Sequence, residues 1–288
     1  RGKGEKIVVL TPVFQNSPLA VFSLDSTPIN TLEQLRQLRI AAGRNEFSKA
    51  QVQAMFLAVG IDPSTIVFVN EAPTIENLMD GTADAIINYD ISAIHRAEEL
   101  GVSLNALHPD DYGVNFYGDV LYTTEDVIER DPELVRRFVQ ASLDGWRYAL
   151  NNKETIADRI SAELPRYRYV VNDTFGYNRL FAERIDDYML FPLVPLGYNQ
   201  IERWQTAYLL LNQLGYIDET FSVDELLSPV EVATQNDVYS AVWSLVAGCV
   251  LALIVLMIFV RSPQTRLIVA LPFLFLIVEQ LIELRYRT

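Results

Sequence analysis

The chain has 288 residues, of which 50% are hydrophobic and 21% are charged, and this balance excludes a chain that is disordered over most of its length. Its 37 acidic side chains outnumber the 23 basic ones, and the sequence has no Lys/Arg cluster, which excludes a nucleic-acid partner. One cysteine, Cys249, and two histidines leave neither a disulfide framework nor a zinc-ligand set, so we expect no metal and no other cofactor.

The first half of the chain alternates β-rich runs with helical periodicity. Leu32, Leu35 and Leu38 recur at helical spacing, and Gly60 ends a second helical run. This rhythm over about 80 residues predicts a mostly parallel sheet wrapped by helices, and residues 131–227 are predicted to be largely helical. The predicted strands are 6–10, 39–42, 66–69, 83–88 and 120–123, and the predicted helices are 31–38, a run through 52–59, 75–79 and 91–100.

Three loops are candidates for a ligand site, because ligands of such sheets bind at the carboxyl ends of the strands. Residues 43–48 offer backbone N–H groups at a helix start, which suit an anionic or carbonyl oxygen. Asn88, Tyr89 and Asp90 bring an amide, an aromatic ring and a carboxylate together. The run 112–119 places aromatic rings among glycines, where a planar ligand could stack. Ordinary turn chemistry uses the same residue types, so composition alone leaves both interpretations open.

Two hydrophobic runs follow the acidic part of the chain. Residues 238–260 are 23 residues without a charge, and a helix of that length would measure about 35 Å, enough to cross a hydrocarbon core of about 30 Å. A buried core helix is the alternative, although such helices are rarely so apolar. The second run, 267–283, contains Pro272 and Glu279 and is either the second arm of a membrane hairpin, which we favour, or a juxtamembrane helix.

The loop between the two runs predicts the orientation in the membrane. Arg261 and Arg266 make this loop positive, so it should face the cytoplasm and leave residues 1–237 on the periplasmic side of a bacterial inner membrane. The chain starts at Arg1 and carries no signal peptide, so we expect a processed N-terminus or a fragment, and the family pattern described next favours a fragment.

Several stretches resemble one protein family. Residues 111–150, "DYGVNFYGDVLYTTEDVIERDPELVRRFVQASLDGWRYAL", resemble the periplasmic solute-binding proteins of the thiamine-pyrimidine-precursor (hydroxymethylpyrimidine) and alkanesulfonate type. The resemblance extends through 8–24, 38–56 and 81–93, and covers about 220 of the 288 residues. Residues 193–227 resemble the form of this domain that is fused to membrane-bound sensory proteins.

This resemblance implies an α/β, periplasmic-binding-protein-like (type II) two-lobed fold over residues 1–230. The second lobe is expected at about 38–120 and the returning first lobe at about 121–230, followed by a membrane helix with its loop in 231–266 and a second hydrophobic helix in 267–288. In the family an acidic residue at the place of Asp90 often contacts an amino-pyrimidine. The implied ligand-binding residues are Gly43, Asn45, Glu46, Ser48, Asn88, Tyr89, Asp90, Asn115, Phe116 and Tyr117.

The sequence departs from the family in two respects. The family begins with strand–helix units before the piece equivalent to residues 6–24, and these roughly 80 to 100 residues are not in this sequence. Either the chain is a fragment, or the native protein keeps the scaffold without the whole pocket. The related fungal pyrimidine synthases have a cysteine-rich run that is absent here, so their chemistry is not expected.

Three functions remain open. The first is a membrane-anchored sensor domain that binds a pyrimidine or sulfonate-like small molecule and signals to a cytoplasmic module. The second is a non-catalytic subunit that docks other subunits of a membrane complex, and the third is the solute receptor of an ABC importer. An enzyme is disfavoured, because the sequence has no nucleophile elbow, phosphate loop or metal-ligand spacing. His95 is expected to be a solvated or cap-forming side chain rather than a functional one.

Overall fold

The computed structural model describes residues 1–163 and 174–228. Both predicted membrane segments, 238–260 and 267–283, lie outside these residues, as does the loop between them. Within the described part, none of the helices is both long and apolar enough to cross a membrane.

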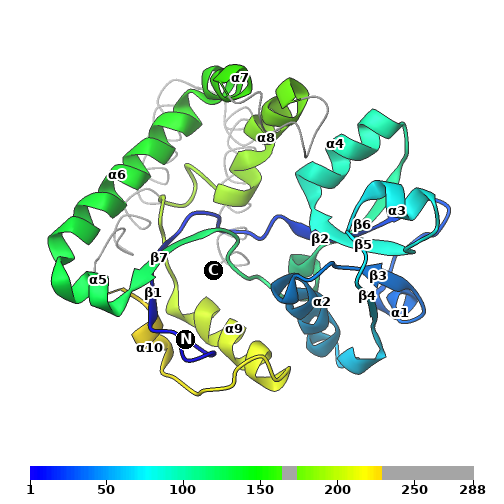
Figure 1. The fold of residues 1–288 in the computed structure, drawn as a ribbon, viewed down its shortest axis with the longest axis horizontal. Coiled ribbons are helices and arrows are strands. Elements are labelled where there is room, and N and C mark those ends of the chain that lie inside the picture. The colour runs from blue at the N-terminus through cyan, green and yellow to red at the C-terminus, as the bar shows by residue number, and fades with distance from the viewer. Residues whose placement is uncertain (164–173, 229–288) are drawn as a thin grey trace, which may run out of the picture. The chain divides into compact units, whose positions relative to one another are not determined.

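A five-stranded sheet lies at the centre of the second lobe (Figure 1). Its strands are β2 (Leu19–Leu24), β3 (Arg39–Ala41), β4 (Val67–Val69), β5 (Ala85–Tyr89) and β6 (Leu104–Leu107). They are ordered β4-β3-β5-β2-β6 across the sheet, and β3 is parallel to both β4 and β5. Because β2 is antiparallel to β5 and to β6, it alone runs against the other four strands.

The position of β2 corrects the expected composition of the sheet. The sheet is not formed only by the strand–helix alternation of residues 39–107, because β2 is inserted between β5 and β6 with the opposite direction. Strand β2 of this sheet begins at Leu19, about 20 residues before residue 38, where the sequence predicts the start of the second lobe. The reason is topological: β2 enters the lobe directly from the preceding strand of the other lobe, without the crossover helix that makes neighbouring strands parallel.

Helices cover both faces of this sheet, as the alternating side chains of β2 show. Val21 packs in one buried cluster with Leu35 and Phe56, whereas its neighbour Phe22 packs in another with Ile75. Successive side chains of a strand point to opposite faces, so two buried clusters require cover on both sides. The covering elements are α1 (Leu32–Leu35), α2 (Glu46–Ala58), α3 (Ile75–Met79), α4 (Asp90–Leu100) and the short turns η1 (Pro63–Thr65) and η2 (Pro109–Tyr112).

The first lobe combines a strand pair with helices. In its described part, β1 (Ile7–Pro12) pairs with β7 (Val120–Thr124) in antiparallel fashion. The helices are α5 (Glu125–Arg130), α6 (Pro132–Asn151), α7 (Lys153–Glu163), α8 (Thr174–Met189), α9 (Ile201–Gln213) and α10 (Val223–Leu226). Asp131 caps α6 by accepting a hydrogen bond from the Leu134 backbone N–H at 2.9 Å. Val135 and Val139, four residues apart, are buried on the inner face of α6.

Two segments connect the lobes and run side by side (Figure 1). The first crossing, residues 13–18, joins β1 to β2, and the second crossing, residues 114–119, leads into β7. The backbone N–H groups of Val13 and Phe14 donate to the Asp119 carbonyl at 2.8 and 3.1 Å. Segments that are far apart in the sequence are thus held in contact, and the predicted site residues lie on or beside them.

Candidate functional site

The loop after β3 uses much of its hydrogen-bonding capacity internally. The Gly43 N–H donates to the Glu71 carbonyl at 3.0 Å, and Gly43 has a positive φ of 57°. Asn45 caps α2 by accepting from the Ser48 N–H at 3.2 Å. Glu46 lies on the surface and pairs with Lys49 at 2.9 Å. Two of the N–H groups that the sequence offered to an anion are therefore already bound within the loop.

The loop after β5 is tied to the second crossing. The Asn88 side chain donates to the Pro73 carbonyl at 3.0 Å and accepts from the Tyr89 N–H at 2.7 Å, so it shapes the turn. The Tyr89 hydroxyl faces the Asp119 carboxylate, and burial together with this negative charge raises the pKa of Tyr89. Burial raises the pKa of Asp119 above its usual value, and the Tyr89 hydroxyl opposes the rise.

Asp90 is the buried carboxylate of the site. It is 7% exposed and starts α4, and its Oδ1 atom accepts from the Ile91 N–H at 2.5 Å. The same oxygen accepts a hydrogen bond from the Tyr188 hydroxyl of α8. Burial raises the pKa of Tyr188, and the hydrogen bond to the carboxylate raises it further. The bond joins the two lobes, because α4 belongs to the second lobe and α8 to the first.

The second crossing contributes aromatic walls. Phe116 and Tyr117 are buried, and the Phe116 ring lies 6.3 Å from that of Phe47 at the start of α2. The Tyr117 hydroxyl accepts from the Gln200 N–H at 2.9 Å, and its ring lies 5.1 Å from Trp204. The Tyr117 hydroxyl therefore joins the second crossing to the residue before α9.

Arg203, on α9, is a central residue of the site that the sequence did not indicate. Its guanidinium lies 3.8 Å above the Tyr117 ring and donates to the Asn115 side-chain oxygen at 2.6 Å and to the Gln15 carbonyl. One side chain thus binds both crossings. Burial lowers its pKa. Its only mark in the sequence is the tryptophan that follows it, Trp204.

The predicted residues form two groups that meet at the second crossing. The loop at 88–90 reaches it where the Tyr89 hydroxyl faces Asp119, and the loop at 43–48 reaches it through the ring contact between Phe47 and Phe116. Glu46 of the predicted set is exposed, and its carboxylate pairs with Lys49 of its own helix. The structure adds Tyr188 and Arg203 to the group, along with Gln15 of the first crossing.

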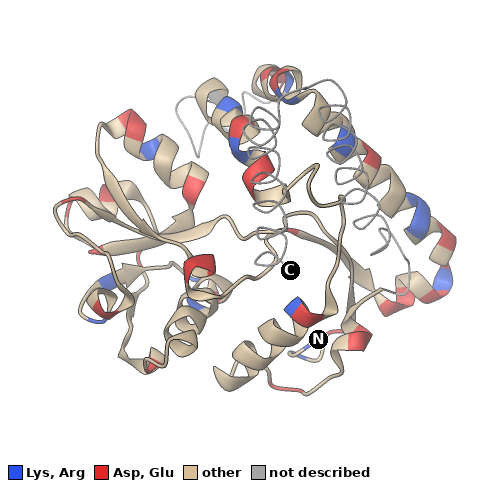
Figure 2. Cartoon of the chain, turned by 180° about the vertical axis from the view of Figure 1, so that it is seen from behind, with Lys and Arg blue, Asp and Glu red and all other residues tan. Residues whose placement is uncertain are grey.

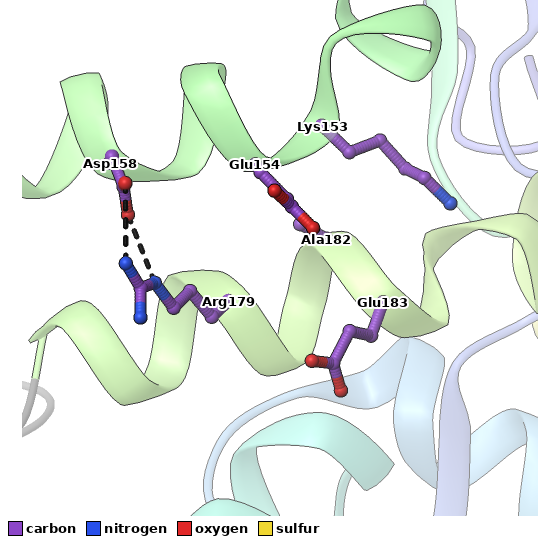
Figure 3. Close-up of a pocket in the computed structure, with 6 residues that line it drawn as sticks. All are labelled: Lys153, Glu154, Asp158, Arg179, Ala182 and Glu183. Atoms are coloured by element: carbon purple, nitrogen blue, oxygen red, sulfur yellow. Dashed lines mark hydrogen bonds and ion pairs between the residues drawn. The ribbon is translucent and has the colours of Figure 1, made fainter.

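Other features of the described residues lie outside this cluster. A hollow of about 520 Å³ between α7 and α8 is lined by Lys153, Glu154, Asp158, Arg179, Ala182 and Glu183 (Figure 3). Three of its five charged side chains are paired, since Arg179 binds Asp158 at 3.0 Å and Lys153 binds Asp186 at 2.6 Å. No group of three or more His, Cys, Asp or Glu side chains in the described part could hold a metal ion. Charged residues are frequent on the helices of the first lobe, whereas the crossings carry one, Asp119 (Figure 2).

Comparison with known proteins assigns the family. Residues 1–156, more than half of the chain, match the family model described as NMT1/THI5 like. The chain belongs to the NMT1/THI5-like family. The resemblance inferred from the sequence motifs is thereby confirmed at the level of the family.

Curated relatives of this family member are binding proteins. The riboflavin-binding protein RibY of Chloroflexus aurantiacus is 27% identical over 238 residues, which are 78% of this chain and 64% of RibY. The formylaminopyrimidine-binding protein of Halalkalibacterium halodurans is 20% identical over 161 residues, or 54% of this chain and 47% of that protein. The chain therefore spans less than two thirds of the length of these relatives.

The fold is that of periplasmic binding proteins. The periplasmic aliphatic sulphonate binding protein SsuA of Escherichia coli matches with a TM-score of 0.56 and 16% identity, over 81% of this chain and 73% of SsuA. At this identity the likeness establishes the α/β fold and no more. It confirms the fold class predicted from the sequence for the described part of the chain.

Proposed function

We propose that this chain is a small-molecule-binding module whose ligand lies at the crossings and makes contact with both lobes. The observation that carries the proposal is that residues from both lobes bind the crossings: Arg203 of α9 lies over Tyr117 of the second crossing, and Asp90 of α4 donates its backbone N–H to Pro18 of the first. Ligand sites combine apolar walls with a few convergent polar groups, and this region has both. We assign no catalytic step to the chain, in keeping with the two curated relatives, which are named as binding proteins.

A nitrogen-rich planar ligand fits the site best. Asp90 is a buried acceptor that suits an amino or ring N–H group, and the exposed Phe47 ring beside Phe116 offers a face for stacking. Riboflavin and formylaminopyrimidine, the ligands named for the relatives, are both of this kind. A sulfonate would have to approach two carboxylates, the buried Asp90 and the exposed Asp119, and the repulsion between like charges disfavours it.

Calorimetry on the full chain tests this function. We expect hydroxymethylpyrimidine or riboflavin to bind, and Asp90→Ala to weaken binding at least about 30-fold, because a charged acceptor is worth roughly 2 kcal/mol. Asp126→Ala removes an equally acidic but exposed side chain and should leave the affinity unchanged. Equal loss in both variants, or no heat with any of these ligands, would count against the site.

We further propose that residues 238–260 anchor the module in the bacterial inner membrane, with residues 1–237 on the periplasmic side. The support is the uncharged run of 23 residues and the arginines that follow it. A cysteine introduced at Ser262 should react only with a thiol reagent supplied from the cytoplasmic side. Labelling from the periplasm would reverse the orientation.

A sensor domain and the receptor of an ABC importer are the two outputs we consider for this anchored module. The resemblance of residues 193–227 to sensor-fused forms favours the first. The likeness in fold to the periplasmic sulfonate-binding protein SsuA of a putative ABC transporter from Methylobacillus flagellatus supports the second. Protein-dependent uptake of a labelled ligand separates them, because a sensor does not transport.

A further inference from the structure

The buried carboxylate of Asp90 is already occupied by a group of this chain. Two donors reach its Oδ1 atom, the Ile91 backbone N–H and the Tyr188 hydroxyl. Among the described residues no Lys or Arg forms an ion pair with it. A buried carboxylate without a cation is stabilised by hydrogen-bond donors. The Tyr188 hydroxyl is one such donor, and a donor group of a ligand could take its place.

The backbone fixes Tyr188 against Asp90 through the first crossing. The Asp90 N–H donates to the Pro18 carbonyl at 2.8 Å, and the Asn16 N–H donates to the Tyr188 carbonyl at 2.9 Å. Tyr188 is 5% exposed, and its ring lies 5.7 Å from that of Phe14. The hydroxyl is therefore held at the carboxylate by three anchored segments and is no chance rotamer of a surface side chain.

A second tyrosine of α8 also contacts α4 through its hydroxyl. Tyr177 of α8 lies 3.2 Å from Ser92 through its hydroxyl and 5.6 Å from His95 through its ring. His95 is buried at 5% exposure, which corrects the expectation of a solvated side chain, because α8 covers this face of α4. Leu190, two residues beyond Tyr188, has a φ of 54°, a strained conformation of the kind found at switch segments.

We propose that Tyr188 stands in for the donor group of the ligand and thereby determines which ligands bind. This role rests on the proposed function: an N–H group of the ligand displaces the Tyr188 hydroxyl from Asp90. A molecule without a hydrogen-bond donor cannot replace the bond from Tyr188 to Asp90, so it does not bind. Tyr188 is thus a specificity-determining residue as well as a bond between the lobes.

Affinity measurements with two tyrosine variants test this role. Tyr188→Phe keeps the ring but removes the competing hydroxyl, so hydroxymethylpyrimidine should bind the full chain about tenfold tighter. The same variant should gain no affinity for ethanesulfonate, which has no N–H donor. Tyr177→Phe is the matched control, because it removes a hydroxyl from the same contact without touching Asp90, and its affinity should change less than about twofold.

The distance between the two lobes, measured without ligand, gives a test that does not depend on which ligand is chosen. Spin labels at Met79 and Leu134, both exposed, report the separation of the lobes in the full chain in lipid nanodiscs. Tyr188→Phe should lengthen this distance by more than about 3 Å, because the bond between the lobes is gone. An unchanged distance overturns the proposal, as does unchanged hydroxymethylpyrimidine affinity in a variant whose parent binds it. Failure of the parent to bind any probe overturns the proposed function instead.

Discussion

Gly118→Ala is expected to lower the free energy of unfolding by about 2 to 3 kcal/mol. A Cβ at this position would lie 2.8 Å from the Phe14 Cβ and 2.9 Å from the Asn16 carbonyl oxygen. The second of these atoms is backbone and the first is fixed to it, so neither can move away without separating the two crossings. The close approach of the crossings therefore requires glycine here.

Gly145→Ala provides the control, and urea denaturation followed by circular dichroism is the measurement. Gly145 lies within α6, and a Cβ there would have no atom within 4 Å. Alanine should stabilise the protein by about 0.5 to 1 kcal/mol, because glycine is a poor helix former. If Gly118→Ala were as stable as the parent, the crossings could not be packed as described.

Arg203→Met is expected to cost about 3 kcal/mol of stability. The substitution keeps the length of the apolar stem but leaves the Asn115 and Gln15 oxygens without their donor and removes the contact with the Tyr117 ring. Leaving buried acceptors unsatisfied costs about 1 to 3 kcal/mol, and loss of a desolvated cation–π contact adds to it. Arg203→Lys should fall between the parent and Met, because an ammonium cannot reproduce the planar fork.

The matched control for Arg203 is Arg147→Met on α6. Arg147 is half exposed and pairs with Asp144 within its own helix, at 2.6 Å. Exposed pairs of this kind contribute about 0.5 kcal/mol or less, so the thermal unfolding midpoint should barely move. Equal shifts in the two methionine variants would mean that Arg203 does not hold the crossings together.

Local patterns in the sequence predicted many of the individual elements, but not the strands β2 and β6. The helix predicted at 75–79 coincides with α3, and the strands predicted at 39–42 and 83–88 correspond to β3 and β5. Hydrophobic periodicity and turn residues carry this information within a few residues of each element. The insertion of β2 between β5 and β6 had no such signal, because strand order is decided by contacts between distant segments.

The same distinction separates the predicted from the missed parts of the site. Loops that follow β3 and β5 could be named from the sequence, because their position depends on local order. The partners of those loops could not: Tyr188 lies 98 residues after Asp90, and Arg203 lies 88 residues after Asn115. A tyrosine in an amphipathic helix and an arginine beside a tryptophan carry no local mark of such contacts.

Hydrogen–deuterium exchange of the full chain, with and without hydroxymethylpyrimidine or riboflavin, tests the position of the ligand most directly. Ligand contact at the crossings should slow amide exchange in peptides covering residues 88–92 and 113–119, and leave those covering 153–158 and 179–183 unchanged. Protection confined to the latter pair, which lines the hollow between α7 and α8, would move the site to a different part of the first lobe and contradict the function proposed for the crossings.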